Sequence, residues 1–133
     1  MIIKLKELLE KIDEEIPIIL YHGTFNALVP EIELKGLIPF GTQYRNYEDI
    51  DEGVYLTNDW NFAGSMVEST ENTNIPDGWI EEVVILAIDT RKLDKSKFDK
   101  DPNVNMPEDD EFRSYIYRGN IPPDAIMEIN DYT

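Results

Sequence analysis

The chain has 133 residues, of which 41% are hydrophobic and none is cysteine, which fits a single domain over residues 1–133 and excludes disulfides, thiolate metal sites and a cysteine nucleophile. Its 12 basic and 28 acidic residues give a net charge of −16; a surface this acidic repels phosphate backbones, so we do not expect it to bind RNA or DNA. No apolar run is long enough to span a membrane, and the charges at Lys4 and Lys6 come too early for a secretory signal, so we expect a cytoplasmic protein.

Residues 1–16 predict an amphipathic helix, because apolar side chains recur at steps of three and four residues with Lys and Glu between them. Pro17 ends this helix, and the β-rich run over residues 18–21 predicts a short buried strand. The apolar residues of the helix are Ile2, Leu5, Leu8, Leu9, Ile12 and Ile16.

Residues 27–35 predict a second helix, with Asn26 as its N-cap and Gly36 at its C-terminal end. Pro30 then lies in the first turn, where proline is tolerated. Residues 39–52 are rich in glycine, asparagine and charge. They predict a surface loop of a length that is often functional in small domains.

Residues 53–57 predict a second short strand, after which Asn58 or Asp59 caps a helix over residues 60–69. Residues 72–78 predict a turn that follows this helix. Apolar and aromatic residues occur in the helix at helical spacing, and they are Trp60, Phe62, Ala63 and Met66.

The longest apolar run lies within residues 79–89 and predicts a buried strand. Residues 92–111 are polar, acidic and contain proline, so they predict a long loop. Alternation of aromatic and polar residues over 112–117 predicts another strand. Residues 119–123 predict a turn, and residues 125–129 predict a final strand or a short helical turn.

This order of elements predicts an α+β fold. One or two early helices are followed by several short strands, which we expect to form a split β-sheet. The core of the domain covers residues 18–130, and the amphipathic helix over residues 1–16 precedes it.

The only histidine of the chain, His22, ends the first predicted strand and is followed at once by Gly23. Histidine can donate and accept hydrogen bonds, and its side chain titrates near neutral pH. Glycine lets a ligand approach the backbone closely. The position therefore fits a binding site. A half-buried structural histidine is the alternative interpretation, and position alone favours it.

Three segments, in this order, resemble the ADP-ribosyltransferase superfamily: residues 20–24 (Leu-Tyr-His-Gly-Thr), residues 53–57 (Gly-Val-Tyr-Leu-Thr) with the helix that follows, and residues 117–126, which contain Ile-Pro-Pro-Asp-Ala-Ile. The resemblance covers residues 18–130 and is closest to the histidine–tyrosine–glutamate branch, which includes diphtheria-toxin-like and poly(ADP-ribose) polymerase-like domains. It implies a glycosyltransferase that transfers ADP-ribose from NAD, of the compact kind found as toxins or in phages and mobile elements. RNA 2′-phosphotransferases share the fold, but they hold RNA phosphates with several basic residues, and this acidic chain has few.

The resemblance implies roles for the matching residues. His22 hydrogen-bonds a ribose hydroxyl of NAD, Gly23 lets the backbone approach the nicotinamide amide, and Thr24 supports the histidine or the ribose. Tyr55 stacks on the nicotinamide ring, a contact worth roughly 1 kcal/mol. A core aromatic packed across the strands is the alternative for Tyr55.

Two positions depart from the family. Met66 lies near the place of a second stacking aromatic; methionine can contact a ring face, and Trp60 or Phe62 is the alternative. Ser114 lies near the place of a glutamate that bonds the ribose and assists transfer, and Glu111 lies at the start of the same strand. We expect either that another strand pairing brings Glu111 into the site or that the third position has no carboxylate.

A dinucleotide pyrophosphate needs local positive charge or backbone N–H donors. Arg45, in the long loop expected beside the NAD site, and Arg113, beside the third segment, are candidate phosphate ligands, with surface ion pairs as the alternative. One histidine and no cysteine exclude histidine-based metal clusters and Cys–His dyads. The acidic residues 108–111 lack the spacing of a calcium loop, so we expect no metal.

Two functions are compatible with these residues. The first is an NAD-dependent mono-ADP-ribosyltransferase, whose acceptor we expect to be a protein because of the charge of −16. The second is a catalytically degenerate domain of the same fold, whose acidic surface binds a basic partner protein as an inhibitor or as a nucleic-acid mimic. His22 and Tyr55 favour the enzyme, whereas Met66 and Ser114 favour the binding module.

Overall fold

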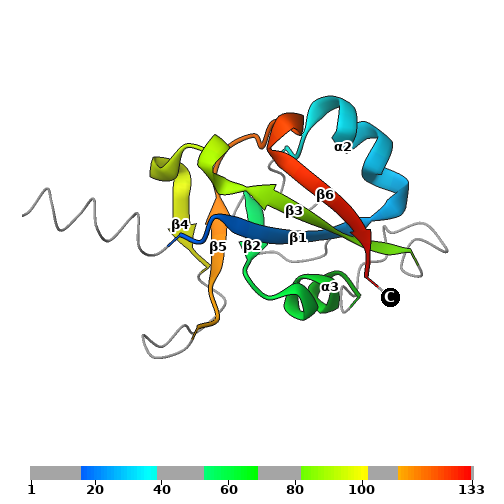
Figure 1. Ribbon diagram of the computed structural model, residues 1–133, viewed down its shortest axis with the longest axis horizontal. Coiled ribbons are helices and arrows are strands. Elements are labelled where there is room, and N and C mark those ends of the chain that lie inside the picture. The colour runs from blue at the N-terminus through cyan, green and yellow to red at the C-terminus, as the bar shows by residue number, and fades with distance from the viewer. Residues whose placement is uncertain (1–15, 39–52, 69–81, 102–110, 133) are drawn as a thin grey trace, which may run out of the picture.

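A computed structural model describes residues 16–38, 53–68, 82–101 and 111–132, and in it six strands form one antiparallel sheet (Figure 1). The strands, in the order β4-β5-β2-β1-β3-β6, are accompanied by two α-helices and four short 3-10 helices. The described chain is therefore a mixed α+β protein. The strands are β1 (Ile19–Phe25), β2 (Val54–Thr57), β3 (Val83–Asp89), β4 (Phe98–Lys100), β5 (Ser114–Tyr117) and β6 (Ile126–Asp131). The helices are η1 (Asn26–Leu28), α2 (Val29–Lys35), α3 (Trp60–Glu68), η3 (Thr90–Lys92), η4 (Lys95–Lys97) and η5 (Pro123–Ala125).

Three predicted segments lie outside the described residues. They are the helix over residues 1–16, apart from the buried Ile16, the loop over 39–52 and the turn over 72–78. In the segments that the structure describes, no helix has both the length and the apolar character needed to cross a membrane.

The two α-helices cover opposite faces of the sheet (Figure 1). The larger core lies against α2, where Val29 and Ile32 pack with apolar residues of the strands. On the other face, Val67 of α3 packs with Phe25 and Val83. All seven residues of β3 are buried, because this central strand is covered on both faces, which explains its continuous apolar sequence.

Most predicted elements within the described residues are confirmed. Each predicted strand segment contains or overlaps an observed strand, and the final segment forms β6 after the turn η5. The predicted cap of α3 is present, because the Phe62 N–H donates to Asp59 Oδ1 over 2.9 Å. Pro30 lies in the first turn of α2, and Gly36 ends that helix with a φ of 80°, a left-handed conformation that favours glycine.

Three expectations are wrong. β1 continues to Phe25, so His22 lies inside the strand and not at its end. Asn26 does not cap α2, because η1 intervenes and the Asn26 side chain donates to Glu82 Oε2 instead. Part of the loop expected over 92–111 forms the edge strand β4, because its backbone pairs with β5.

The shortest strand pairing in the sheet is the one between β1 and β2. β1 pairs with β3 along all seven of its residues, but it pairs with β2 only at Tyr21↔Thr57. β2 in turn pairs with β5 along its whole length. The sheet therefore consists of two well-paired halves, β4-β5-β2 and β1-β3-β6, which meet at one residue pair. We call this junction the β1–β2 seam.

Gly23 in β1 allows α3 to approach the sheet closely. A Cβ atom at this position would collide with the main-chain oxygen of Ala63 and would lie 2.7 Å from Val67 Cγ2. The first of these atoms belongs to the helix backbone, which cannot turn aside as a flexible side chain can. The distance between α3 and β1 is therefore one that glycine permits and alanine does not.

We expect Gly23→Ala to lower the free energy of unfolding by about 1–3 kcal/mol, because the added methyl group forces α3 away from β1. Denaturant and thermal unfolding followed by circular dichroism measure this loss. Gly119→Ala is the matched control, since the nearest atom to its Cβ, at 2.8 Å, would belong to the flexible side chain of Lys97, with Cε2 of Tyr117 at 3.2 Å and no backbone atom as close, and its loss should be smaller. Wild-type stability of Gly23→Ala would contradict the close contact between α3 and β1.

Asp89, at the end of β3, is held by the side chain of Arg91. Arg91 Nε donates to Asp89 Oδ1 over 2.9 Å, and Nη2 donates to Oδ2 over 3.0 Å. These bonds favour the charged carboxylate, so they lower the pKa of Asp89 below its ordinary value. The stability that the pair contributes is present above the ordinary carboxyl pKa and is lost as the pH falls through the lowered pKa of the folded protein.

Asp89→Asn should therefore be less stable than the wild type at neutral pH, and the difference should shrink as the pH falls below about 4. A pH series of thermal unfolding midpoints measures it. Glu33→Gln makes the same chemical change at an exposed position of α2 and should differ little from the wild type at any pH. A deficit of Asp89→Asn that stays constant with pH would rule out the contribution of the charged pair.

Candidate functional site

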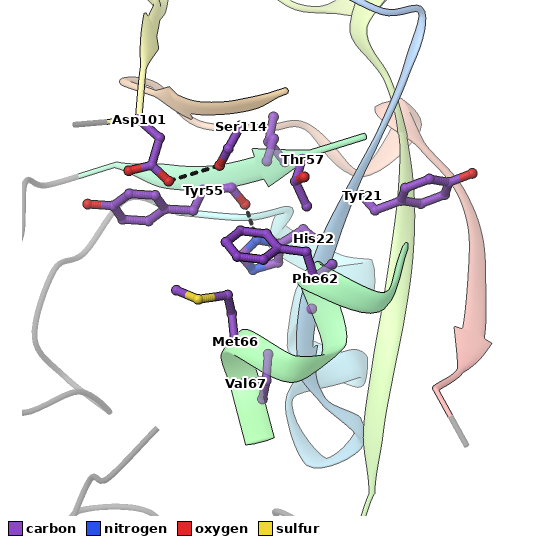
Figure 2. A pocket seen from close by; sticks show the side chains of 12 residues that line it. Tyr21, His22, Tyr55, Thr57, Phe62, Met66, Val67, Asp101 and Ser114 are labelled. Carbon is purple, nitrogen blue, oxygen red and sulfur yellow. Dashed lines mark hydrogen bonds between the residues drawn. The ribbon is translucent and has the colours of Figure 1, made fainter. Parts of the chain in front are cut away.

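A pocket lies beside the β1–β2 seam, between α3 and the sheet (Figure 2). Four strand regions and one helix contribute to it. The lining residues are Tyr21, His22 and Gly23 from β1, Tyr55, Leu56 and Thr57 from β2, Phe62, Ala63, Met66 and Val67 from α3, Ser114 from β5, and Asp101, which directly follows β4. Segments that are far apart in the sequence thus meet at one site.

His22 bridges the seam with a hydrogen bond from its side chain. Its Nδ1 atom lies 2.8 Å from the main-chain oxygen of Tyr55 in β2 (Figure 2). A carbonyl oxygen can only accept, so we assign the proton to Nδ1, which donates. In the neutral ring, Nε2 is then the acceptor nitrogen. A histidine held in this way can accept a hydrogen bond from a ligand hydroxyl.

A row of four side chains crosses the sheet on the pocket side. Tyr21↔Thr57 and Thr57↔Ser114 are paired residues of β1, β2 and β5. The Asp101 N–H donates to the Ser114 main-chain oxygen over 3.1 Å and extends the β4–β5 pairing by one residue. Directly opposed residues of antiparallel strands project to the same face. Asp101, Ser114, Thr57 and Tyr21 therefore form what we call the polar row.

The carboxylate end of the polar row is buried. Asp101 is 4% exposed and Ser114 is 2% exposed, and Ser114 Oγ donates to Asp101 Oδ2 over 2.8 Å (Figure 2). A charged carboxylate can only accept, so this bond has a fixed direction when Asp101 is ionised. The hydroxyl of Thr57 donates instead to the Arg113 main-chain oxygen over 2.9 Å. The bond to Ser114 therefore orients the carboxylate of Asp101, the one carboxylate among the described residues that line the pocket.

Helix α3 forms an apolar wall opposite the polar row. Phe62 and Met66 lie one turn apart and so share a face of the helix, and both line the pocket. The ring of Phe62 is held by an edge contact with Phe112, with ring centroids 5.0 Å apart. Trp60 makes a similar contact with Tyr21 over 5.5 Å, but it is not one of the described residues that line the pocket.

Five of the predicted site residues come together at this pocket. They are His22, Gly23, Tyr55, Met66 and Ser114. The structure also gives Gly23 a packing role, because α3 occupies the space beside its Cα. The resemblance to the transferases did not indicate that role.

The remaining predicted site residues lie elsewhere. Thr24 is buried in β1, Glu111 is exposed, and the guanidinium of Arg113 donates to a neighbouring main-chain oxygen over 2.7 Å. None of the three is among the described pocket residues. Asn58 Nδ2 donates to the main-chain oxygen of Glu111 over 2.7 Å, so the strand pairing that would bring this glutamate into the site is not the one observed. Arg45 lies outside the described residues.

Asp101 is a pocket residue that the sequence does not reveal. It follows a strand of only three residues, which is too short for a clear alternation. A weak signal does exist, since Phe98 packs against the rings of Tyr115 and Tyr117, whereas the next residue, Asp99, is exposed. Continued alternation puts Asp101 on the same face as Asp99, which is the pocket side.

The groups around the pocket suit an organic ligand that has hydroxyl groups and a flat ring. They include the imidazole ring of His22, the oriented carboxylate of Asp101 and the apolar wall of α3, which contains the ring of Phe62. Within the described ranges, no group of three or more His, Cys, Asp and Glu side chains is arranged to hold a metal ion.

In comparisons with known proteins, no family model matches the chain and no curated protein matches it significantly. The chemistry of the site must therefore be inferred from its geometry and from the three segments that resemble the transferases.

His22→Asn should lose less stability than His22→Ala. The asparagine amide can place an N–H close to the position of Nδ1 and retain the bond to the Tyr55 oxygen. Alanine removes this donor, which costs about 1–3 kcal/mol when the acceptor is shielded from water. Denaturant unfolding of the two variants measures the difference. Equal losses would show that this hydrogen bond does not hold the seam.

Proposed function

We propose that this chain is an NAD-dependent mono-ADP-ribosyltransferase with the split-sheet fold of that superfamily. The observation that carries the proposal is the meeting of His22 and Tyr55. These residues are 33 positions apart in the sequence, each lies in a segment that resembles the family, and a hydrogen bond joins them at one pocket. The two halves of the sheet that meet at the β1–β2 seam support the proposed fold.

In the proposed binding mode, Nε2 of neutral His22 accepts a hydrogen bond from a hydroxyl of the nicotinamide ribose. The bond from Nδ1 to the Tyr55 oxygen supports this role, because it sets both the tautomer and the orientation of the ring. The nicotinamide ring lies between Tyr55 and the α3 wall. There the ring of Phe62 and the thioether of Met66 favour a flat aromatic group.

The proposed acceptor is a protein. A net charge of −16 attracts basic protein surfaces and repels nucleic acid. Arg113, next to Ser114 in the sequence, and main-chain N–H groups are the proposed partners of the NAD pyrophosphate. A cytoplasmic location and a toxin-like role in a phage or a mobile element are part of the same proposal.

Ser114 favours a second function. Many relatives in the histidine–tyrosine–glutamate branch have a glutamate near this place, so a chain with serine there can bind a ligand without transferring ADP-ribose. In that case the acidic surface acts as a binding module for a basic partner protein, either as an inhibitor or as a mimic of nucleic acid.

Stacking on Tyr55 predicts how NAD affinity depends on this residue. In calorimetric titrations, the wild type and Tyr55→Phe should bind NAD alike, whereas Tyr55→Leu should bind about five- to tenfold more weakly, since a lost ring contact costs about 1 kcal/mol. Met127→Ala, at a position of β6 that is 50% exposed, is the control and should bind as the wild type does.

Incubation with labelled NAD and host lysate then separates the two functions. Transfer of label or release of nicotinamide supports the enzyme, and binding of NAD without either supports the binding module. If the wild type does not bind NAD even at millimolar concentration, the enzyme proposal fails.

A further inference from the structure

We propose that Asp101 is the catalytic carboxylate of this site and that Ser114 is the residue that positions it. This inference rests on the proposed function. It differs from both alternatives that the sequence suggests for the third position, because the site then has a carboxylate and that carboxylate does not belong to Glu111.

Asp101 reaches the pocket through the pairing of β4 with β5. The β4–β5 register runs from Phe98↔Tyr117 to Lys100↔Tyr115, and the N–H of Asp101 continues it to Ser114. The carboxylate therefore comes from the strand next to the one that carries Ser114. Backbone pairing, and not loop geometry, fixes its position.

The pairing also puts Asp101 on the same face of the sheet as Tyr55, the residue proposed to stack on the nicotinamide ring. Ser114 opposes Thr57, and Tyr55 is two residues before Thr57 in β2, so the side chains of all three project to one face. Asp101 and Tyr55 both line the pocket (Figure 2). A nicotinamide ring stacked on Tyr55 would hold its ribose within the same pocket as the carboxylate.

Ser114 controls which way the carboxylate faces. Its Oγ donates to Oδ2 of Asp101 over 2.8 Å, and both residues are almost fully buried. This bond holds one carboxylate oxygen of Asp101 in a fixed place. Ser114 thus acts through Asp101 and is a positioning residue.

Burial makes this negative charge effective. A charge in a site from which water is excluded interacts with a developing positive charge more strongly than one in bulk solvent does. Asp101 is 4% exposed, whereas Glu111 is exposed to solvent. Of these two carboxylates, Asp101 is the one placed to stabilise a ribosyl cation.

The proposed step balances without any further reactant. The bond between ribose C1′ and the nicotinamide nitrogen breaks, its electron pair goes to that nitrogen, and nicotinamide leaves as a neutral molecule. Positive charge develops at C1′, where the Asp101 carboxylate stabilises it. A lone pair of the acceptor forms the new bond to C1′, and the proton of the acceptor passes to Asp101 and then to solvent.

Water can serve as the acceptor in this step. The products are then ADP-ribose, nicotinamide and a proton. Release of nicotinamide therefore reports on the step before the protein acceptor is known, and it can be measured together with NAD binding on the full chain.

Asp101→Asn removes the charge but keeps the size of the side chain and an oxygen that can accept from Ser114. We expect it to bind NAD with an affinity close to that of the wild type and to release nicotinamide about 100-fold more slowly or slower still. Asp99→Asn is the matched control. Asp99 lies in β4, two residues before Asp101, where it is exposed and paired with Arg118, and this variant should keep the turnover of the wild type.

Two further variants separate catalysis from folding. Added formate should restore part of the turnover of Asp101→Ala, because a free carboxylate can occupy the space that the variant leaves. Ser114→Ala should lower kcat with little change in KM, and Ser114→Thr, which retains a hydroxyl donor, should recover it. Loss of turnover in Asp101→Ala without recovery by formate would assign Asp101 to folding and overturn the proposal.

The outcomes also distinguish this inference from the proposed function. Wild-type turnover in Asp101→Asn, or loss of turnover in Glu111→Gln instead, overturns the role of Asp101 and leaves the transferase standing. NAD binding by the wild type without nicotinamide release overturns the role of Asp101 in favour of the binding module. Absence of NAD binding by the wild type overturns both proposals.

Discussion

The hydrogen bond from His22 Nδ1 to the main-chain oxygen of Tyr55 is the constraint on which the pocket depends. β1 and β2 pair only at Tyr21↔Thr57. Beyond that pair, the His22 side chain supplies the donor that the backbone would supply in a regular ladder. The two strands can therefore separate while the carbonyl group keeps a donor. The seam that results is the place where side chains from both halves of the sheet meet.

The remainder of the pocket follows from strand register and from one close contact. Thr57 aligns β1 with β5, and the β4–β5 pairing then adds Asp101 to the polar row. On the other side, Gly23 lets α3 approach the sheet, which brings Phe62 and Met66 over the row. His22, the oriented carboxylate of Asp101 and the apolar wall of α3 thus all line one pocket. This combination fits a ligand in which a ribose is joined to a flat ring.

Residue patterns could predict only part of this arrangement. His22, Tyr55 and Ser114 were open to prediction because they lie in or close to short segments that resemble the ADP-ribosyltransferase superfamily, whereas the position of His22 alone favoured a structural role. Asp101 was not, because its position depends on how a three-residue edge strand pairs with β5, and a strand of three residues carries only a weak periodic signal. The partner of His22 was hidden for another reason. It is a main-chain oxygen, which every residue has, so no residue type marks it.

The ring nitrogens of His22 can be observed by ¹⁵N NMR, and they report on the seam and on the binding site together. Because this is the only histidine of the chain, its two nitrogen signals are unambiguous. With the ring neutral, we expect a protonated Nδ1 and an unprotonated Nε2 in the free protein. Addition of NAD should shift the Nε2 signal while Nδ1 stays protonated. A proton on Nε2 in the free protein, or signals that NAD leaves unchanged, would contradict the proposed role of His22 in NAD binding.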